Sequence, residues 1–183
     1  MALGNALDTT KILTGGALVK IGGWTYNAAA ATLLSFGHLL TPAELGFAFE
    51  DFDIETEQSI GRVKTIPVSA NYTLKFDVAQ NEADAMLIAS RQPSTQLTGS
   101  NNTTVLGFSD PKEIYYQVAL IGSGYATSGT ETYTFWKAQV SSVDNIPFGK
   151  KAVQHLGMTL KILRDDSISA PLTNGYYGNR KFV

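Results

Sequence analysis

The stretch that decides the fold is NYTLKFDVAQNEADAMLIAS, residues 71–90, in which the spacing of apolar residues changes from one regular period to another. In its first part, apolar and polar residues alternate, with one face formed by Tyr72, Leu74, Phe76 and Val78 and the other by Asn71, Thr73, Lys75 and Asp77. A period of two is typical of a half-buried β-strand. The sequence therefore predicts a strand over residues 71–78.

A short helix is predicted directly after this strand. Asn81 is a residue type that caps free backbone amides, and apolar residues then recur at helical spacing until Pro93. Because the residue before proline is driven out of the helical region, the helix has to end before that point. Neither the strand nor the helix carries an evident catalytic group.

The rest of the chain consists of strand-like runs separated by polar loops, which predicts a mainly β protein. Pro67 marks an edge, a bulge or a break, because proline cannot donate to a strand ladder. The clearest alternation is Leu156, Met158, Leu160 and Ile162. Further strands are predicted at residues 17–23, 47–58, 61–80, 113–122 and 131–140.

Three segments are not assigned to the core: residues 35–45, 94–104 and 167–183. We expect the first two to be loops. The third has too few apolar residues for a core, yet it keeps Tyr176, Tyr177 and Phe182. Aromatic residues on a coil favour docking onto another surface.

Length and composition favour one domain with partners. A chain of 183 residues is long enough for one core, and no linker divides it. The charged fraction of 16% lies below the usual value of roughly 25%, which indicates a surface partly covered by other molecules. The net charge of -2 argues against a strongly basic nucleic-acid binder.

The residues give no support for catalysis, a metal or a cofactor. The chain has no cysteine, which excludes disulfides and thiolate sites. His38 and His155 stand in no metal-ligand spacing, and the chain lacks phosphate-loop, dinucleotide and nucleophile-elbow motifs. The start MALGNALDTTK is not a secretory signal and no run is long enough to span a membrane, so we expect folding in a cytoplasm.

The feature that needs an explanation is EDFDIETE, residues 50–57, whose acids Asp51, Asp53, Glu55 and Glu57 point to one side of an extended strand. Side chains two apart lie roughly 7 Å from one another, so this face has to be in contact with water. The stretch is not a calcium-binding loop, because it lacks the sixth-position glycine and the twelfth-position glutamate of that motif. A glycosidase carboxylate pair would need a substrate cleft, for which the sequence gives no support. An exposed acidic face, or one that lines a water-filled channel and repels a polyanion, explains the row better.

From Phe47 to Ser90 the chain has an acidic long strand, a hairpin tip QSIGR, returning strands VKTIPVSANYTLKFDVAQ and the helix NEADAMLIAS. This order resembles the major tail tube proteins of long-tailed, siphovirus-type bacteriophages. The resemblance extends more loosely to TGGALVKIGG near the start and KKAVQHLGMTLKILRDD near the end.

The resemblance implies one tail-tube domain over residues 1–183: a β-sandwich or barrel with one flanking helix, a long hairpin, an N-terminal arm (1–14) and a C-terminal arm (167–183). It implies a structural virion protein, not an enzyme, that forms stacked hexameric rings, assembled in the host cytoplasm into the tube through which DNA is ejected. Tail terminator, tail-tip and tape-measure proteins would be partners, with no membrane and no cofactor.

Which strand faces the lumen is not fixed by the resemblance; the charge pattern favours Asp51, Asp53, Glu55 and Glu57. The tip residues Gln58, Ser59, Ile60, Gly61 and Arg62 would reach the adjacent ring, and Tyr176, Tyr177 and Phe182 would dock on neighbours.

Two alternatives remain open. One is another phage or surface structural subunit, such as a decoration or secretion-tube protein. The other is a carbohydrate-binding β-sandwich, for which Trp24 or Trp136 with Tyr115 would supply exposed aromatic rings.

Overall fold

The computed structural model describes residues 18–24, 26, 33–36, 39–55, 62–79, 83–100, 103–123, 130–146, 155–168 and 175–182. Over these residues the protein is mainly β with one short α-helix, as the sequence predicts. The strands are β1 (Leu18–Gly23), β2 (Leu34–Ser35), β3 (Glu44–Glu55), β4 (Arg62–Val78), β5 (Leu97–Ser100), β6 (Thr103–Leu106), β7 (Tyr116–Ser123), β8 (Thr130–Val143), β9 (Leu156–Leu163) and β10 (Gly178–Phe182).

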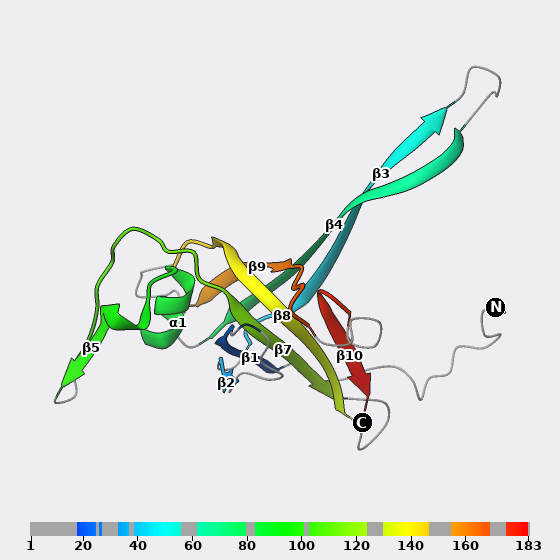
Figure 1. Ribbon diagram of the computed structural model, residues 1–183. Helices are drawn as coiled ribbons and strands as arrows, with labels where there is room; N and C mark the ends of the chain where they lie inside the picture. The colour runs from blue at the N-terminus through cyan, green and yellow to red at the C-terminus, as the bar shows by residue number, and fades with distance from the viewer. Residues whose placement is uncertain are drawn as a thin grey trace.

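One antiparallel sheet forms the body of the molecule, in the order β2-β1-β7-β8-β9-β4-β3, and β10 pairs with β8 beside the end of β9. The sheet curls on itself to enclose the core. One opening of the curled sheet is closed by residues that follow β2, because Leu39 bridges to Val78 of β4 and the Leu40 amide donates to the Asp77 carbonyl at 2.8 Å. At the other end β3 and β4 leave the body together (Figure 1).

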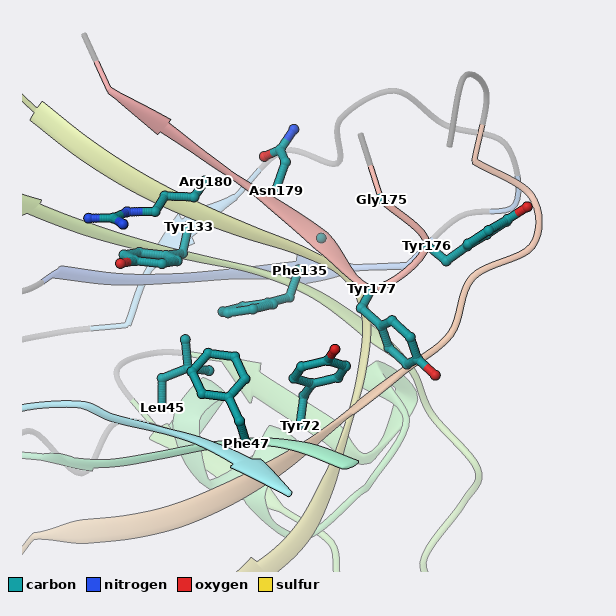
Figure 2. A pocket seen from close by; sticks show the side chains of 11 residues that line it. Leu45, Phe47, Tyr72, Tyr133, Phe135, Gly175, Tyr176, Tyr177, Asn179 and Arg180 are labelled. Atoms are coloured by element: carbon teal, nitrogen blue, oxygen red, sulfur yellow. The ribbon is translucent and has the colours of Figure 1, made fainter. Parts of the chain in front are cut away.

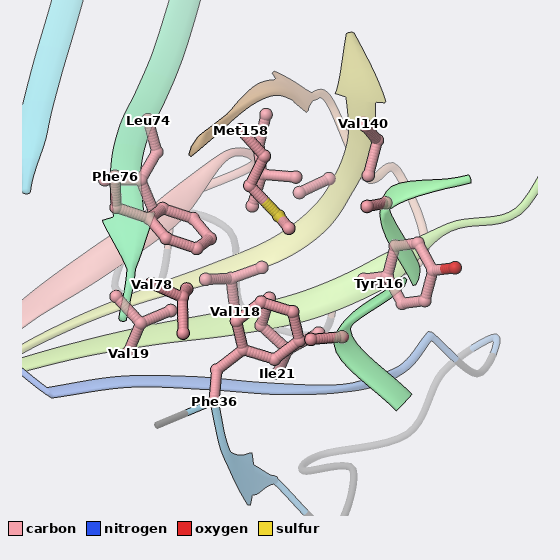
Figure 3. Packing of buried hydrophobic residues seen from close by; sticks show 14 of the residues in the cluster. Val19, Ile21, Phe36, Leu74, Phe76, Val78, Tyr116, Val118, Val140 and Met158 are labelled. Carbon is pink, nitrogen blue, oxygen red and sulfur yellow. The ribbon is translucent and has the colours of Figure 1, made fainter. Parts of the chain in front are cut away.

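The core fills the inside of the curled sheet (Figure 3). The predicted alternation of β9 is confirmed, because Leu156, Met158 and Leu160 are completely buried and Ile162 is nearly so. From β4, Leu74, Phe76 and Val78 enter the same core. Val19 and Ile21 of β1 pack against them from the opposite wall, so strands far apart in the sheet share one apolar interior.

The α-helix α1 (Ala83–Ala89) flanks the body at the end away from the projecting hairpin (Figure 1). It buries Ala85 and Ala89, two small residues that allow its backbone to lie close to the sheet. At its C-terminal end the Met86 carbonyl accepts both the Ser90 amide at 2.9 Å and the Ser90 hydroxyl at 2.6 Å. The predicted helix is thus confirmed, although its proposed cap, Asn81, lies outside the described residues.

Three segments differ from the sequence-based expectations. Residues 94–104 were expected to be a loop, but they contain the 3₁₀ helix η2 (Ser94–Gln96) and the strand β5, which forms a small hairpin with β6. Strand β3 begins at Glu44, inside the other expected loop. The C-terminal segment is not all coil, because Gly178–Phe182 form β10 in the chain's own sheet. In all three segments, pairing with a distant or neighbouring strand outweighs weak local preferences.

Strands β3 and β4 form the long hairpin that the sequence predicts. Their register shifts between Glu50 and Asp51, where Ser69 and Pro67 are the opposing residues and Val68 is left without a partner. This is a β-bulge, one of the three outcomes expected at Pro67. Only Tyr72–Val78 of β4 also pair with β9, so the part beyond them is a two-stranded ribbon.

Candidate assembly surfaces

The projecting hairpin exposes large apolar side chains instead of burying them. Residues 62–71 of β4 pair with β3 alone, and they span roughly 33 Å of extended chain. Phe47, Phe49 and Phe52 are 58%, 62% and 61% exposed. Aromatic rings of this size are normally buried, and clustered exposure marks an interaction surface.

Beyond the bulge, the hairpin has two chemically different faces. On one, Phe52 lies opposite Ile66, with Ile54 next along β3; we call this set the apolar face of the hairpin. On the other, Asp51 and Asp53 share the acidic face of the hairpin. The register shift produces this sorting, because it brings Ile66 opposite Phe52 rather than opposite Asp53.

The acidic residues are held by hydroxyl groups across the ribbon. Thr65 Oγ1 donates to Asp53 Oδ1 at 2.7 Å, and Ser69 Oγ donates to Glu50 Oε2 at 2.9 Å. Asp51 is exposed and Asp53 is half-buried, so the wet face expected from the sequence is present at these two positions.

Several predicted residues of the hairpin are only partly described. Glu55 pairs with Arg62 at the end of the ribbon, and only their backbones are described. Glu57, Gln58, Ser59, Ile60 and Gly61 lie outside the described residues.

A groove of about 340 Å³ opens where the hairpin leaves the body (Figure 2). We call it the mouth groove. Tyr72 stands at its centre, with its ring 4.7 Å from that of Tyr177 and 5.5 Å from that of Phe47. The mouth groove is lined by Leu45, Phe47, Tyr72, Tyr133, Phe135, Gly175, Tyr176, Tyr177, Gly178, Asn179 and Arg180. It lies at an end of the core that the described strands leave open, and most of its lining residues are aromatic.

Strand β10 forms one wall of the mouth groove and is fixed by several contacts. Arg180 pairs with the buried Glu131 of β8 and lies over the Tyr133 ring, 5.3 Å from its centroid. Trp136 donates through Nε1 to the Gly175 carbonyl at 3.0 Å. The outer edge of β10 pairs with no other strand of the described chain.

The predicted docking residues of the C-terminal segment lie near this wall. Tyr177 packs on Tyr72 of its own chain, and Tyr176 is covered by Arg164, whose guanidinium lies 4.0 Å from the ring centroid. Phe182 is in β10 opposite Glu131, and only its backbone is described. Two of the three aromatic residues thus contribute to the mouth groove.

Two of the three aromatic residues considered for sugar binding, Trp24 and Tyr115, are covered by a cation. Trp24 and Tyr115 meet edge to face at 5.8 Å, and Lys137 Nζ lies 4.7 and 4.0 Å from their ring centroids. Trp24 Nε1 also donates to Asp165 Oδ2 at 2.7 Å. A sugar would have to displace the ammonium group to stack on these faces, so the arrangement favours a structural role.

Asp165 is a buried carboxylate at the end of β9. Burial by itself would raise the pKa of Asp165. Hydrogen bonds from the Ser167 hydroxyl and from Trp24 act in the opposite direction, and the Ser167 amide and the charge of Lys137 add to them. Together they lower the pKa of Asp165 below its ordinary value. The ionised carboxylate therefore joins three segments of the chain.

Tyr116 is a second buried ionisable residue. Its hydroxyl has no hydrogen-bond partner among the described residues, and the same holds for the nearby buried Nε of Arg91. Burial raises the pKa of Tyr116 to about 12, although the charge of Arg91 acts in the opposite direction. Tyr116 is therefore neutral at ordinary pH.

Within the described part of the chain, no group of three or more acidic or histidine side chains is arranged to hold a metal ion. None of the helices described is both long and apolar enough to cross a membrane. His155 lies just before β9, and His38 falls outside the described residues.

Comparison with solved structures finds 17 similar chains. No model of a known protein family matches the chain, and no curated protein matches it. One similar chain is in the cryo-EM structure of the anti-feeding prophage baseplate, with 10% identity, a TM-score of 0.48, and 94% of this chain and 95% of that chain covered. Another is in the structure of the anti-feeding prophage cap, which terminates its tube, with 9% identity, a TM-score of 0.49, and 100% and 94% covered.

Sequence reasoning found the hairpin but missed the mouth groove. The groove depends on which end of the curled sheet is closed, and the contacts that decide this join Leu39 to Val78 and Tyr72 to Tyr177. The adjacent aromatic residues Tyr176 and Tyr177 are the signal in the sequence that indicates this surface, but the sequence does not show which strands they contact.

Proposed function

We propose that this protein is a structural subunit of a bacteriophage tail, and specifically that it assembles into the stacked hexameric rings of a tail tube. The observation that carries the proposal is the projecting β3–β4 hairpin with exposed aromatic side chains. A folded chain gains nothing from extending a two-stranded ribbon with exposed Phe49 and Phe52 into water, because a hairpin without a packing partner is marginally stable. Burial against another molecule explains both its length and its composition.

Unpaired strand edges support self-assembly. Within the described chain, β3 pairs only with β4, so its outer edge is free over a long strand. An exposed, apolar edge of this kind normally leads to uncontrolled association unless it is paired or covered. Closed rings of identical subunits solve this problem, because each free edge meets its counterpart on the next subunit.

The acidic face of the hairpin agrees with a channel that passes nucleic acid. Asp51 and Asp53 keep the ribbon negatively charged where it is wet, and a like-charged wall repels the phosphate backbone of DNA. The lumen would then be formed by the acidic face and the inter-ring contact by the tip. The resemblance to tail tube proteins supplies the six-fold symmetry and the expected terminator, tail-tip and tape-measure partners.

Negative-stain electron microscopy of the purified protein tests the proposal directly. The expected result is rings with a central hole, stacked into tubes as the protein concentration rises, and sedimentation velocity should show large species in the same samples. A homogeneous monomer at the highest soluble concentration, in both measurements, would contradict the tube assignment.

A further inference from the structure

We propose that Ile12 and Leu13 dock in the mouth groove of their own chain and close the open end of the core. The proposal goes beyond the tail-tube assignment and does not depend on it. Residues 1–17 lie outside the described residues. Three features carry the proposal: the place where β1 begins, the sequence just before β1, and the volume and lining of the mouth groove.

Strand β1 begins at the rim of the mouth groove. The register places one residue from each of four neighbouring strands in a single row: Val19, Leu120, Tyr133 and Arg180. Val19 is completely buried, whereas Tyr133 and Arg180 line the groove. Leu18, the first residue of β1, stands one row further out, so the chain that precedes β1 enters the sheet at the open end of the core.

The segment before β1 is long enough to reach the groove. Strand β10, one wall of the groove, is three strands away from β1, which is roughly 14 Å at the usual spacing of strands. The five steps from Leu13 to Leu18 span up to about 17 Å when extended. Between them, Gly15 and Gly16 allow the chain to turn over the rim, because glycine adopts backbone conformations that other residues avoid. A tethered segment within reach has an effective concentration in the millimolar range, which favours its own groove over that of a second copy.

The mouth groove suits uncharged aliphatic side chains. Its volume of about 340 Å³ exceeds the roughly 150 Å³ with which an apolar cavity holds a benzene-sized group. Most of its described lining residues are aromatic, and Phe47 among them is 58% exposed (Figure 2). Arg180 is the one charged residue in this described lining, and it already pairs with Glu131. Residues 12–17, ILTGGA, carry no charge, so they can enter the groove without burying an unpaired ion.

The absence of cysteine permits a position-specific test. Thr10→Cys, which leaves Ile12 and Leu13 in place, is combined either with Phe47→Cys in the groove or with Ala48→Cys, the adjacent residue on the opposite face of β3. After mild oxidation in dilute solution, non-reducing electrophoresis separates a link within one chain from a link between two chains. The expected result is an internal link that forms at least about fivefold faster with Phe47→Cys than with Ala48→Cys.

Paired substitutions test the two anchors. Ile12→Asp with Leu13→Asp should abolish the preference for Phe47→Cys, because a carboxylate is costly to place in an aromatic groove. In the cysteine-free protein the same pair should lower the midpoint of thermal unfolding by about 2–4 °C, with the circular dichroism spectrum of the folded state retained. Thr9→Asp with Thr14→Asp adds the same charge at neighbouring polar positions. This matched control should keep both the preference and the midpoint.

A selective internal link that depends on Ile12 and Leu13 supports the proposal. Equal linking at the two β3 positions, no link in either protein, or a selective link that the aspartates do not affect would overturn it. Links between chains in place of internal ones would also overturn it and would show that a second copy fills the groove. Rings and tubes are scored separately by electron microscopy, so their presence or absence bears on the proposed function alone.

Discussion

The buried carboxylate of Glu131 accepts a hydrogen bond from the guanidinium Nε of Arg180, across the pair of strands β8 and β10. Glu131 is 2% exposed, and a carboxylate in that position is stable only with a cationic partner. The contact explains how a short strand with the sequence GNRKF stays in the sheet.

Arg180→Met should lower the free energy of unfolding by about 2 kcal/mol, because it leaves the charge of Glu131 buried without this partner. Partial exposure of Arg180 places the effect at the lower end of the range for buried pairs. Urea denaturation followed by tryptophan fluorescence measures it. Lys181→Met is the control and should change stability by less than about 0.5 kcal/mol; equal losses in the two variants would rule out a specific role for the ion pair.

Gly178→Ala should displace β10. A Cβ atom at this position would overlap the backbone carbonyl oxygen of Thr134, which cannot move without disturbing β8. We expect a loss of about 1–3 kcal/mol and faster hydrogen exchange of the β10 amides than in the wild type. Gly23→Ala, where no atom lies within 4 Å, is the matched control. Unchanged exchange at β10 in Gly178→Ala would show that the strand is not held as described.

Tyr116→Phe should leave stability at neutral pH unchanged or raise it by up to about 1 kcal/mol, because the lost hydroxyl makes no hydrogen bond within the described chain. In the wild type, the raised pKa of Tyr116 means that the folded state holds its proton more tightly than the unfolded state does. Stability should therefore fall by about 2–3 kcal/mol as the pH rises from about 10 to about 12. Urea unfolding over this pH range should show a smaller fall in Tyr116→Phe; identical curves would contradict the assignment.

Asp165→Asn should weaken the junction with Trp24 and Ser167, at a cost of about 1–2 kcal/mol at pH 7. Because the folded-state pKa is lowered, the stabilisation from the carboxylate is complete above its ordinary pKa of about 4 and is lost as the pH falls through the folded value. The acid limb of a stability-pH curve should be flatter in the variant. Asp166→Asn, at an exposed neighbouring residue, should leave the fall in stability at acid pH unchanged. If stability falls at acid pH in Asp165→Asn as steeply as in the wild type, the prediction is wrong.

Asp53→Lys combined with Glu55→Lys tests the lumen assignment of the acidic face. Reversal of these charges should slow or stop DNA passage while tubes still form, because a cationic wall attracts the phosphate backbone. Assembly is followed by electron microscopy and DNA release from particles by fluorescence of a DNA-binding dye. Normal release from particles with well-formed variant tubes would remove the acidic strand from the lumen.

Much of the fold follows from local patterns. The alternation at Leu156–Ile162 predicts β9 because each second residue enters a dry core, and the change of period after Val78 predicts α1. Both signals are strong because burial on one face is complete. Apolar and acidic side chains alternate over much of residues 47–58, and this pattern likewise predicts the long strand of the hairpin. In the structure this strand, β3, begins earlier, at Glu44.

The elements that were missed depend on contacts between distant residues. The β5–β6 hairpin, residues 97–106, is built largely from threonine, glycine and serine, which carry little apolar pattern. Strand β10 exists because β8 is longer than β9 and leaves backbone groups free between Glu131 and Phe135. The mouth groove also requires that, among the described residues, the bridge from Leu39 to Val78 closes one end of the curled sheet and leaves the other open, and no single segment encodes this.

The unpartnered residue Val68 has a consequence for the geometry of any assembly. A bulge increases local twist and bends the strand that contains it, so the distal ribbon leaves its root at an angle that Val68 sets. Deleting Val68 would remove this bulge, although a second register shift remains between Ile54 and Glu55, and would still leave Ile66 opposite Phe52. The side chains between the two shifts would keep their partners while this part of the ribbon straightened. In a chain of copies joined through that ribbon, one side chain that is 65% exposed would determine the rotation between successive subunits, and with it the handedness and repeat of the whole polymer.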